Sequence, residues 1–168
     1  MKRECSLISG ITGMSALFAG VLFYVFFRDP HEVYFLGFLD LPAGGSATLP
    51  PFLTSLGGHL PSFLHVFSFS LLTAAFLPLT RKAIFFSCTF WTVVNLCFEL
   101  GQKYKTAAAG IVPSWFQGIP FLENTADFFR FGSFDAIDMT AMTAGGVAAG
   151  LFLSLMLQRR LDHEKRNT

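Results

Sequence analysis

The sequence predicts an all-α integral membrane protein, a four-transmembrane-helix bundle formed by a single membrane domain over residues 1–168. Three observations lead to this prediction. Charged residues make up only 14% of the chain, against about 25% in an ordinary soluble domain. The 22 phenylalanines carry more apolar surface than a soluble protein of this length can cover. Finally, four apolar segments each approach the roughly 20 residues that a helix needs to cross a bilayer.

The first span is predicted over residues 7–27, which are 21 consecutive uncharged residues. A secretory signal peptide is the alternative, because Lys2 and Arg3 precede the run. An apolar signal core is only about 7–15 residues long and ends at a small-residue cleavage site. Here the apolar run continues into Arg28-Asp29-Pro30, which is a poor cleavage site. We therefore favour an uncleaved span.

Three more spans are predicted over residues 61–79, 83–101 and 136–157. Pro61 opens the second of them, at a first helical position where proline is tolerated. Only the short basic stretch 80–82 separates the second span from the third. A link of this length predicts an antiparallel helical hairpin.

The basic residues predict the orientation, because Lys and Arg near span ends are retained in the cytoplasm. With the N-terminus inside, eight basic residues fall on inner segments: Lys2, Arg3, Arg81, Lys82, Arg159, Arg160, Lys165 and Arg166. Four fall on outer segments: Arg28, Lys103, Lys105 and Arg130. We therefore expect both termini in the cytoplasm and a multi-pass protein of the inner (cytoplasmic) membrane.

Two long outer loops, residues 28–60 and 102–135, follow from this topology. Both mix aromatic with polar residues, as in 33–39 and 128–131. This mixture favours the lipid headgroup region. Burial of the aromatics against helix ends is the alternative, and the sequence leaves both open. We expect His31 and His59 to be ordinary interfacial residues of the first loop.

Small residues recur every four positions on two spans, at Thr12, Ala16 and Gly20 and again at Gly146 and Gly150. Such spacing lets helices approach closely in lipid, where apolar side chains gain little by leaving the acyl chains. We favour packing within the bundle. A homo-oligomer seam is the alternative, and the oligomeric state stays open.

Polar residues inside membrane helices are costly and suggest function. The predicted topology brings His65, Glu99 and Asp138 to one depth near the outer face. Further candidates for a binding cluster share a helical face or the same depth, namely Asn95, Gln102, Arg130 and Asp135. Arg130 is the nearest candidate counter-charge for Asp138, and His65 is another. For Asp135, capping of the fourth span and membership of the site are equally good readings.

Several chemistries fit this cluster. His65, Glu99 and Asp138 are the candidates for acid–base catalysis, although a catalytic role is not assigned. Carboxylates with a histidine could also hold a divalent cation, or form a structural polar network. Catalytic motifs such as HExxH and Gly-x-Ser-x-Gly are absent from the sequence. We assign no metal and no cofactor.

The composition excludes other classes. A net charge of +1 argues against nucleic-acid binding, which needs a concentrated basic face. The three cysteines make neither a disulfide framework nor a Cys/His ligand cluster, so they are expected to be small buried hydrophobes.

Two motifs resemble the VanZ-like membrane protein family. The first is Phe98-Glu99-Leu100-Gly101-Gln102, and the second is Ser133-Phe134-Asp135-Ala136-Ile137-Asp138. His65 and Phe69 are similar to a His-x-x-x-Phe pattern in the preceding helix, so the likeness covers about residues 58–155. Gly132 stands where the family usually has arginine, and Arg130 lies two residues earlier.

The resemblance implies a small helical bundle with a role at the bacterial cell envelope. We expect an accessory or binding protein whose outer polar cluster contacts membrane lipid, a lipid-linked envelope precursor or a partner membrane protein. A membrane enzyme acting on a lipid-linked substrate is the alternative. A transporter is a weaker one, because the inner halves of the predicted spans lack ionisable residues.

Overall fold

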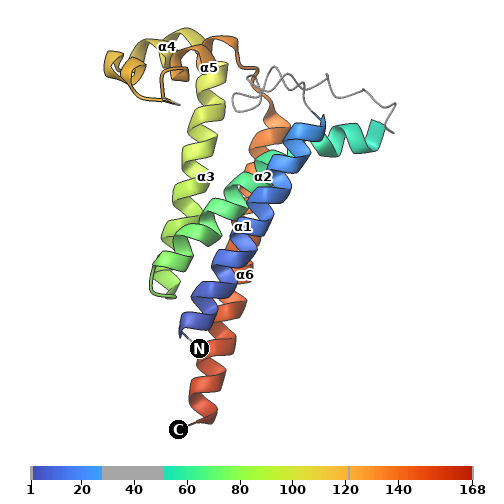
Figure 1. Cartoon of the computed structure of the whole chain (residues 1–168), viewed down its shortest axis with the longest axis vertical. Coiled ribbons are helices and arrows are strands. Elements are labelled where there is room, and N and C mark those ends of the chain that lie inside the picture. The colour runs from blue at the N-terminus through green and yellow to red at the C-terminus, as the bar shows by residue number, and fades with distance from the viewer. Residues whose placement is uncertain (1, 28–50, 121, 168) are drawn as a thin grey trace.

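The computed structural model describes residues 2–27, 51–120 and 122–167 of the chain. These residues form the helices α1 (Lys2–Phe27), α2 (Pro51–Phe76), α3 (Arg81–Lys103), α4 (Lys105–Ile111), η2 (Ser114–Gly118), α5 (Thr125–Phe131) and α6 (Ala136–Arg166). No β-strand occurs in the part of the chain that the structure describes. Figure 1 shows α1, α3 and α6 running roughly along the long axis, α2 crossing them obliquely, and α4 and α5 at one end.

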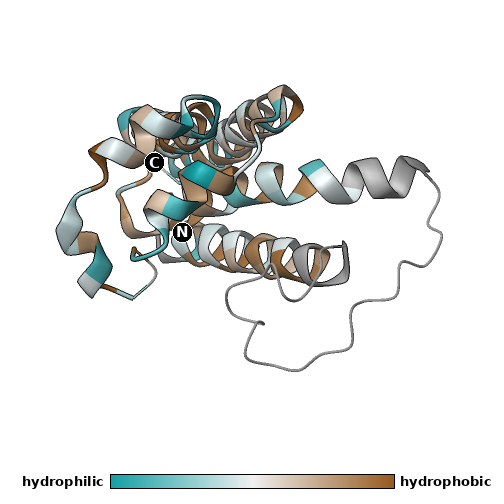
Figure 2. Cartoon of the chain, turned by 90° about the horizontal axis from the view of Figure 1, so that it is seen from above, coloured by the Kyte–Doolittle hydropathy of each residue, from teal (hydrophilic) through white to brown (hydrophobic). Residues whose placement is uncertain are grey.

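Four of the described helices are long and apolar enough to cross a membrane, within Glu4–Phe23, Gly57–Phe76, Arg81–Lys103 and Ala136–Arg166. Hydrophobic residues run along these helices (Figure 2) and many face outward. Phe76 is 90% exposed and Phe85 is 72% exposed. Exposed rings of this kind suit lipid better than water. The described residues thus confirm the prediction of an all-helical protein with four helices long and apolar enough to span a membrane.

Helix α2 begins earlier than the sequence suggested. Pro61 was expected to open the second span, but it lies inside a helix that starts at Pro51. The prolyl nitrogen has no hydrogen to donate to the carbonyl of Gly57, so the helix loses one bond there. Residues 51–60, expected in an outer loop, are thus helical, and residues 28–50, including the aromatic stretch 33–39 and His31, lie outside the described residues.

Helix α1 packs mainly against α2. The hydroxyl of Ser9 donates a hydrogen bond to the carbonyl of Leu71 at 2.8 Å, and that of Ser6 donates to Ala75. Gly20 lies against Leu64 on the same face of α1. Gly20, one of the three small residues at that spacing, therefore packs within the bundle, as was favoured.

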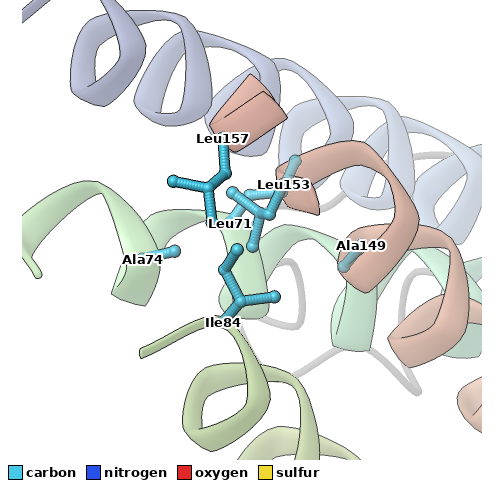
Figure 3. Close-up of a cluster of buried hydrophobic side chains, with 6 residues drawn as sticks. All are labelled: Leu71, Ala74, Ile84, Ala149, Leu153 and Leu157. Atoms are coloured by element: carbon cyan, nitrogen blue, oxygen red, sulfur yellow. The ribbon is translucent and has the colours of Figure 1, made fainter. Parts of the chain in front are cut away.

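The core is formed where α2, α3 and α6 meet (Figure 3), from Leu71, Ala74, Ile84, Ala149, Leu153 and Leu157. Towards α4 and α5, α6 approaches its neighbours through glycines. Gly145 faces the backbone of Phe63 in α2, and Gly146 faces Thr92 in α3. These contacts leave no room for a larger residue, so the glycines determine how closely α6 approaches the two helices.

The second expected outer loop, residues 102–135, contains short helices rather than an extended chain. Its aromatic residues pack against the end of α3. The centroid of the Phe98 ring lies 5.6 Å from that of Phe129 and 6.0 Å from that of Phe128. Gly101 permits this contact, because a side chain there would overlap the Phe129 ring. Helix α5 is thereby held against the end of α3.

Candidate functional site

The start of α6 supplies two carboxylates to the site. Asp135 is the N-cap residue, and its Oδ1 accepts a hydrogen bond from the backbone N–H of Ile137 at 2.8 Å. Asp138 lies in the first turn, one turn further along the same face. Negative charge is stabilised here by the free N–H groups and the dipole of the helix.

Helix α2 brings an imidazole to both carboxylates. Nδ1 of His59 lies 2.9 Å from Oδ1 of Asp138 and 3.8 Å from Oδ2 of Asp135. Each of the three residues offers one possible ligand atom, and these three atoms lie within 4.8 Å of one another. We call His59, Asp135 and Asp138 the His–Asp–Asp cluster.

Helix α3 joins the cluster through Glu99. Its Oε1 accepts a hydrogen bond at 2.6 Å from the backbone N–H of Asp135, and the residue is only 6% exposed. A hydrogen bond to a carboxylate is stronger than one between neutral groups, at about 1.5–3 kcal/mol. Glu99 therefore ties α3 to the residue that caps α6.

Gln102, one turn after Glu99, is buried without a hydrogen bond to any described residue. It is 8% exposed. Gly132 allows it to lie there, since a Cβ on Gly132 would come within 2.7 Å of Cδ of Gln102. A buried amide can form several hydrogen bonds, and leaving them unmade is costly.

These residues line one cavity of about 1070 Å³, which lies between the helices at the end that carries α4 and α5. Figure 1 shows that α3 diverges from α1 and α6 towards this end. The lining comes from α1, α2, α3, α5 and α6, with Leu17, Trp91 and Met142 among its apolar members. Four carboxylates line it: Glu99, Asp127, Asp135 and Asp138.

No lysine or arginine is among the described residues that line this cavity, and its basic groups are the imidazoles of His59 and His65. Among the ligands that such a cavity could hold are metal cations, ammonium groups and groups that donate O–H or N–H bonds. Bare phosphate would meet repulsion from the carboxylates.

The other residues predicted from sequence take different positions. His65 lines the cavity, but its ring stacks on Phe69, with centroids 4.6 Å apart. Asn95 also lines the cavity and donates a hydrogen bond to the carbonyl of Trp91 at 2.8 Å. The structure thus gathers Asn95, Glu99, Gln102, Asp135 and Asp138 around one space.

Arg130 is not the counter-charge of Asp138. Its Nη1 lies 3.3 Å from Oδ1 of Asp127 on the exposed side of α5, and Arg130 does not line the cavity. The reason is local: the two residues are three apart on one short helix and pair with each other. The group beside Asp138 is instead His59.

His59 was missed because it was assigned to an outer loop ending at Pro61. The sequence does contain a signal for an earlier helix. Phe52, Leu56 and Leu60 recur every four residues, directly after Pro51 at a first helical position. A helix begun there carries His59 into the bundle.

No family model matches this chain, and neither does any curated protein or solved structure. The fold and the cavity define a multi-pass helical membrane protein with an acidic cavity at one end of its spans.

Proposed function

We propose that this chain is a VanZ-like bacterial membrane protein that binds a polar ligand of the cell envelope in its acidic cavity and does not convert it chemically. One observation carries the proposal. Both motifs on which the family resemblance rests line the same cavity, through Glu99 and Gln102 from the first and Asp135 and Asp138 from the second. Gln102 and Asp135 are 33 positions apart in the sequence, yet both line this cavity. A role confined to each residue's own helix would not require the two motifs to meet.

The proposed orientation puts both termini in the cytoplasm of an inner-membrane protein. The excess of basic residues on the predicted inner segments supports it. The start of α1 and the end of α6 lie at one end of the molecule, opposite α4 and α5 (Figure 1). With this orientation, the cavity opens towards the outer face, where envelope precursors are used.

The charges of the cavity narrow the class of ligand. Asn95 and Gln102 offer amides, and Glu99 offers a carboxylate that accepts a hydrogen bond from the backbone N–H of Asp135 and has capacity for more. A sugar or peptide group supplies many O–H and N–H donors for these acceptors. We therefore propose the sugar or peptide portion of a lipid-linked precursor as ligand, with its lipid chain beside the exposed apolar faces of the spans.

Ligand retention tests the proposal. The full chain is expressed in a bacterium, extracted in mild detergent, and its co-purifying lipids and lipid-linked precursors are quantified by mass spectrometry. We expect the wild type to retain a glycosylated or peptide-bearing lipid, and Gln102→Leu and Asp138→Asn to lose most of it. Asp162→Asn, which removes a carboxylate at the opposite end of α6, is the matched control. Equal retention by all four proteins would overturn the proposal.

The orientation is tested by labelling single cysteines in intact cells with a membrane-impermeant maleimide, after the three native cysteines are replaced by serine. Cysteine at Lys105, in α4, should react, and cysteine at Asp162 should react only after lysis. The reverse pattern would place the cavity on the cytoplasmic side.

A membrane enzyme is the second candidate, favoured by the short contact between Nδ1 of His59 and Asp138. A carboxylate beside an imidazole is an arrangement that general acid–base catalysis uses. The sequence suggested His65 and Glu99 as the acid–base pair; both line the cavity, and the ring of His65 packs at a tilt against that of Phe69. Conversion of the retained ligand by wild type but not by Asp138→Asn would favour the enzyme over the binding protein.

A further inference from the structure

We propose that His59, Asp135 and Asp138 bind a divalent transition-metal ion of the Zn²⁺ class at the edge of the cavity. The inference deepens the proposed function, since the ion would form part of the same ligand site. Cation binding is nevertheless measurable without the organic ligand, so the two proposals can fail separately.

The separations between the ligand atoms suit a small cation. Zn²⁺ binds nitrogen and carboxylate oxygen at about 2.0–2.2 Å, which places neighbouring ligands of a tetrahedral site about 3.4 Å apart. Nδ1 of His59 lies 2.9 Å from Oδ1 of Asp138 and 3.8 Å from Oδ2 of Asp135. The two distances bracket that value, and the carboxylate oxygens of Asp135 and Asp138 lie within 4.8 Å of each other, so small side-chain movements would bring all three ligand atoms to one ion.

The donor atoms select the kind of metal. Imidazole nitrogen suits Zn²⁺ and its transition-metal neighbours, whereas Mg²⁺ and Ca²⁺ prefer oxygen ligands throughout. Three protein donors also leave a coordination position for a ligand, as in zinc sites that keep a fourth position open. In this chain that position would face the cavity.

Charge favours a cation here. Two carboxylates converge on the same imidazole nitrogen, which carries at most one hydrogen and can satisfy only Asp138 at hydrogen-bond distance. The carboxylate of Glu99 is held nearby through the backbone N–H of Asp135. Partly buried negative charges of this kind need a compensating positive charge. A divalent ion bonded to both aspartates supplies it.

Gln102 gives an independent indication that the cavity is built for a ligand. It is more than nine-tenths buried, it lines the cavity, and it makes no hydrogen bond to any described residue. Its amide is not among the fully buried polar groups that lack a partner in the described residues, which are the hydroxyls of Ser68, Ser70 and Ser87, so it reaches the cavity, where a ligand or water can complete its bonds. The His–Asp–Asp cluster and Gln102 border the same space, so a metal-bound ligand would lie within it.

The test is a direct titration of the full chain. The protein is purified through a tag without histidine, stripped of metal with chelator, and titrated with Zn²⁺ by calorimetry in detergent. We expect one Zn²⁺ per chain, weaker binding of Mn²⁺, and little binding of Mg²⁺ or Ca²⁺. His59→Gln and Asp138→Asn should each weaken Zn²⁺ binding by at least about tenfold, since even changes beyond the ligands cost about 10–100-fold.

Matched controls lie at the opposite end of α6. His163→Gln and Asp162→Asn remove the same types of group and should leave the affinity for Zn²⁺ unchanged. Asp135→Asn is a further test variant, because asparagine remains a good N-cap residue while the anionic ligand is lost. If Asp138→Asn does not fold, Asp135→Asn and His59→Gln still decide the question.

Three results would overturn the metal proposal: no Zn²⁺ binding, equal binding of Ca²⁺ and Zn²⁺, or affinity unchanged in all three cluster variants. Each would leave the proposed function in place if Gln102→Leu still lost the retained ligand. If every variant still retained the ligand while Zn²⁺ bound at the His–Asp–Asp cluster, only the proposed function would be overturned.

Discussion

Replacing Gly145 with alanine should weaken the contact between α2 and α6 that holds His59 beside Asp138. Gly145 lies about two turns after Asp138 on α6, and its partner Phe63 lies one turn after His59 on α2. A Cβ on Gly145 would come closer than 3.0 Å to the carbonyl oxygen of Phe63, where ordinary contact begins at 3.4 Å. The atom it meets belongs to the backbone and cannot rotate away, so the helices must separate.

The magnitude follows from two opposing effects. Overpacking of a well-packed interface costs about 1–3 kcal/mol. Alanine in place of glycine inside a helix returns about 0.5–1 kcal/mol. We therefore expect Gly145→Ala to lower the free energy of unfolding by about 1–2 kcal/mol. Gly150→Ala is the matched control, because its nearest atom, Sγ of Cys88, lies 3.8 Å away in ordinary contact. That variant should be as stable as wild type or slightly more stable.

The assay is equilibrium unfolding of both variants in the same detergent, followed by far-ultraviolet circular dichroism. The affinity for Zn²⁺ is measured in parallel, since separation of α2 from α6 would also move His59 away from Asp138. If Gly145→Ala proves as stable as Gly150→Ala, the close approach of the two helices at this point is wrong.

Three further predictions concern the cavity and its supports. Glu99→Ala should destabilise the protein by about 1–3 kcal/mol, because the partly buried N–H of Asp135 loses its acceptor. Glu99→Gln, which keeps an acceptor, should cost less, and equal losses in equilibrium unfolding would contradict this. In Gly132→Ala the added Cβ would overlap both the carbonyl oxygen of Phe128 and the side chain of Gln102, so the end of α5 and Gln102 should both shift. Ligand retention should fall several-fold although no charge changes, and full retention would argue against a role for Gln102. Thr80→Ala should remove the side-chain cap of α3 and lower the free energy of unfolding by about 1 kcal/mol in the same assay. An unchanged free energy of unfolding would show that the Thr80 side chain does not cap this helix.

Much of the fold follows from local sequence properties. The apolar runs predicted four spanning helices because a bilayer demands about 20 apolar residues per crossing, whatever the helices pack against. The tight link before Arg81 predicted the turn between α2 and α3. Small residues on α1 predicted close packing, and Gly20 does lie against Leu64.

The start of α2 was misplaced because Pro61 resembles a helix opening. A proline within a helix costs one hydrogen bond, and sequence alone does not show whether packing will offset that loss. The error moved His59 out of the bundle. It also explains why His65 and Arg130 were preferred as partners of Asp138, while the structure pairs them with Phe69 and Asp127.

Asp135 illustrates what two levels of structure contribute. Its position before the apolar run predicted an N-cap, and the backbone N–H of Ile137 confirms that role. Its second oxygen turns towards His59, which comes from a helix more than 70 residues earlier in the chain. The two roles were alternatives in the sequence and are compatible in the structure.

The sequence by itself determined the class of protein, the number of spans and most of the polar residues at one end, because hydropathy, helix length and capping act locally along the chain. The tertiary structure decided which of those residues meet. The close approach of α6 to α2 at Gly145 depends on backbone geometry, and it selects His59 rather than His65 as the neighbour of Asp138. Helix periodicity gives the face of each side chain, but only the packing of four helices places those faces around a single acidic cavity.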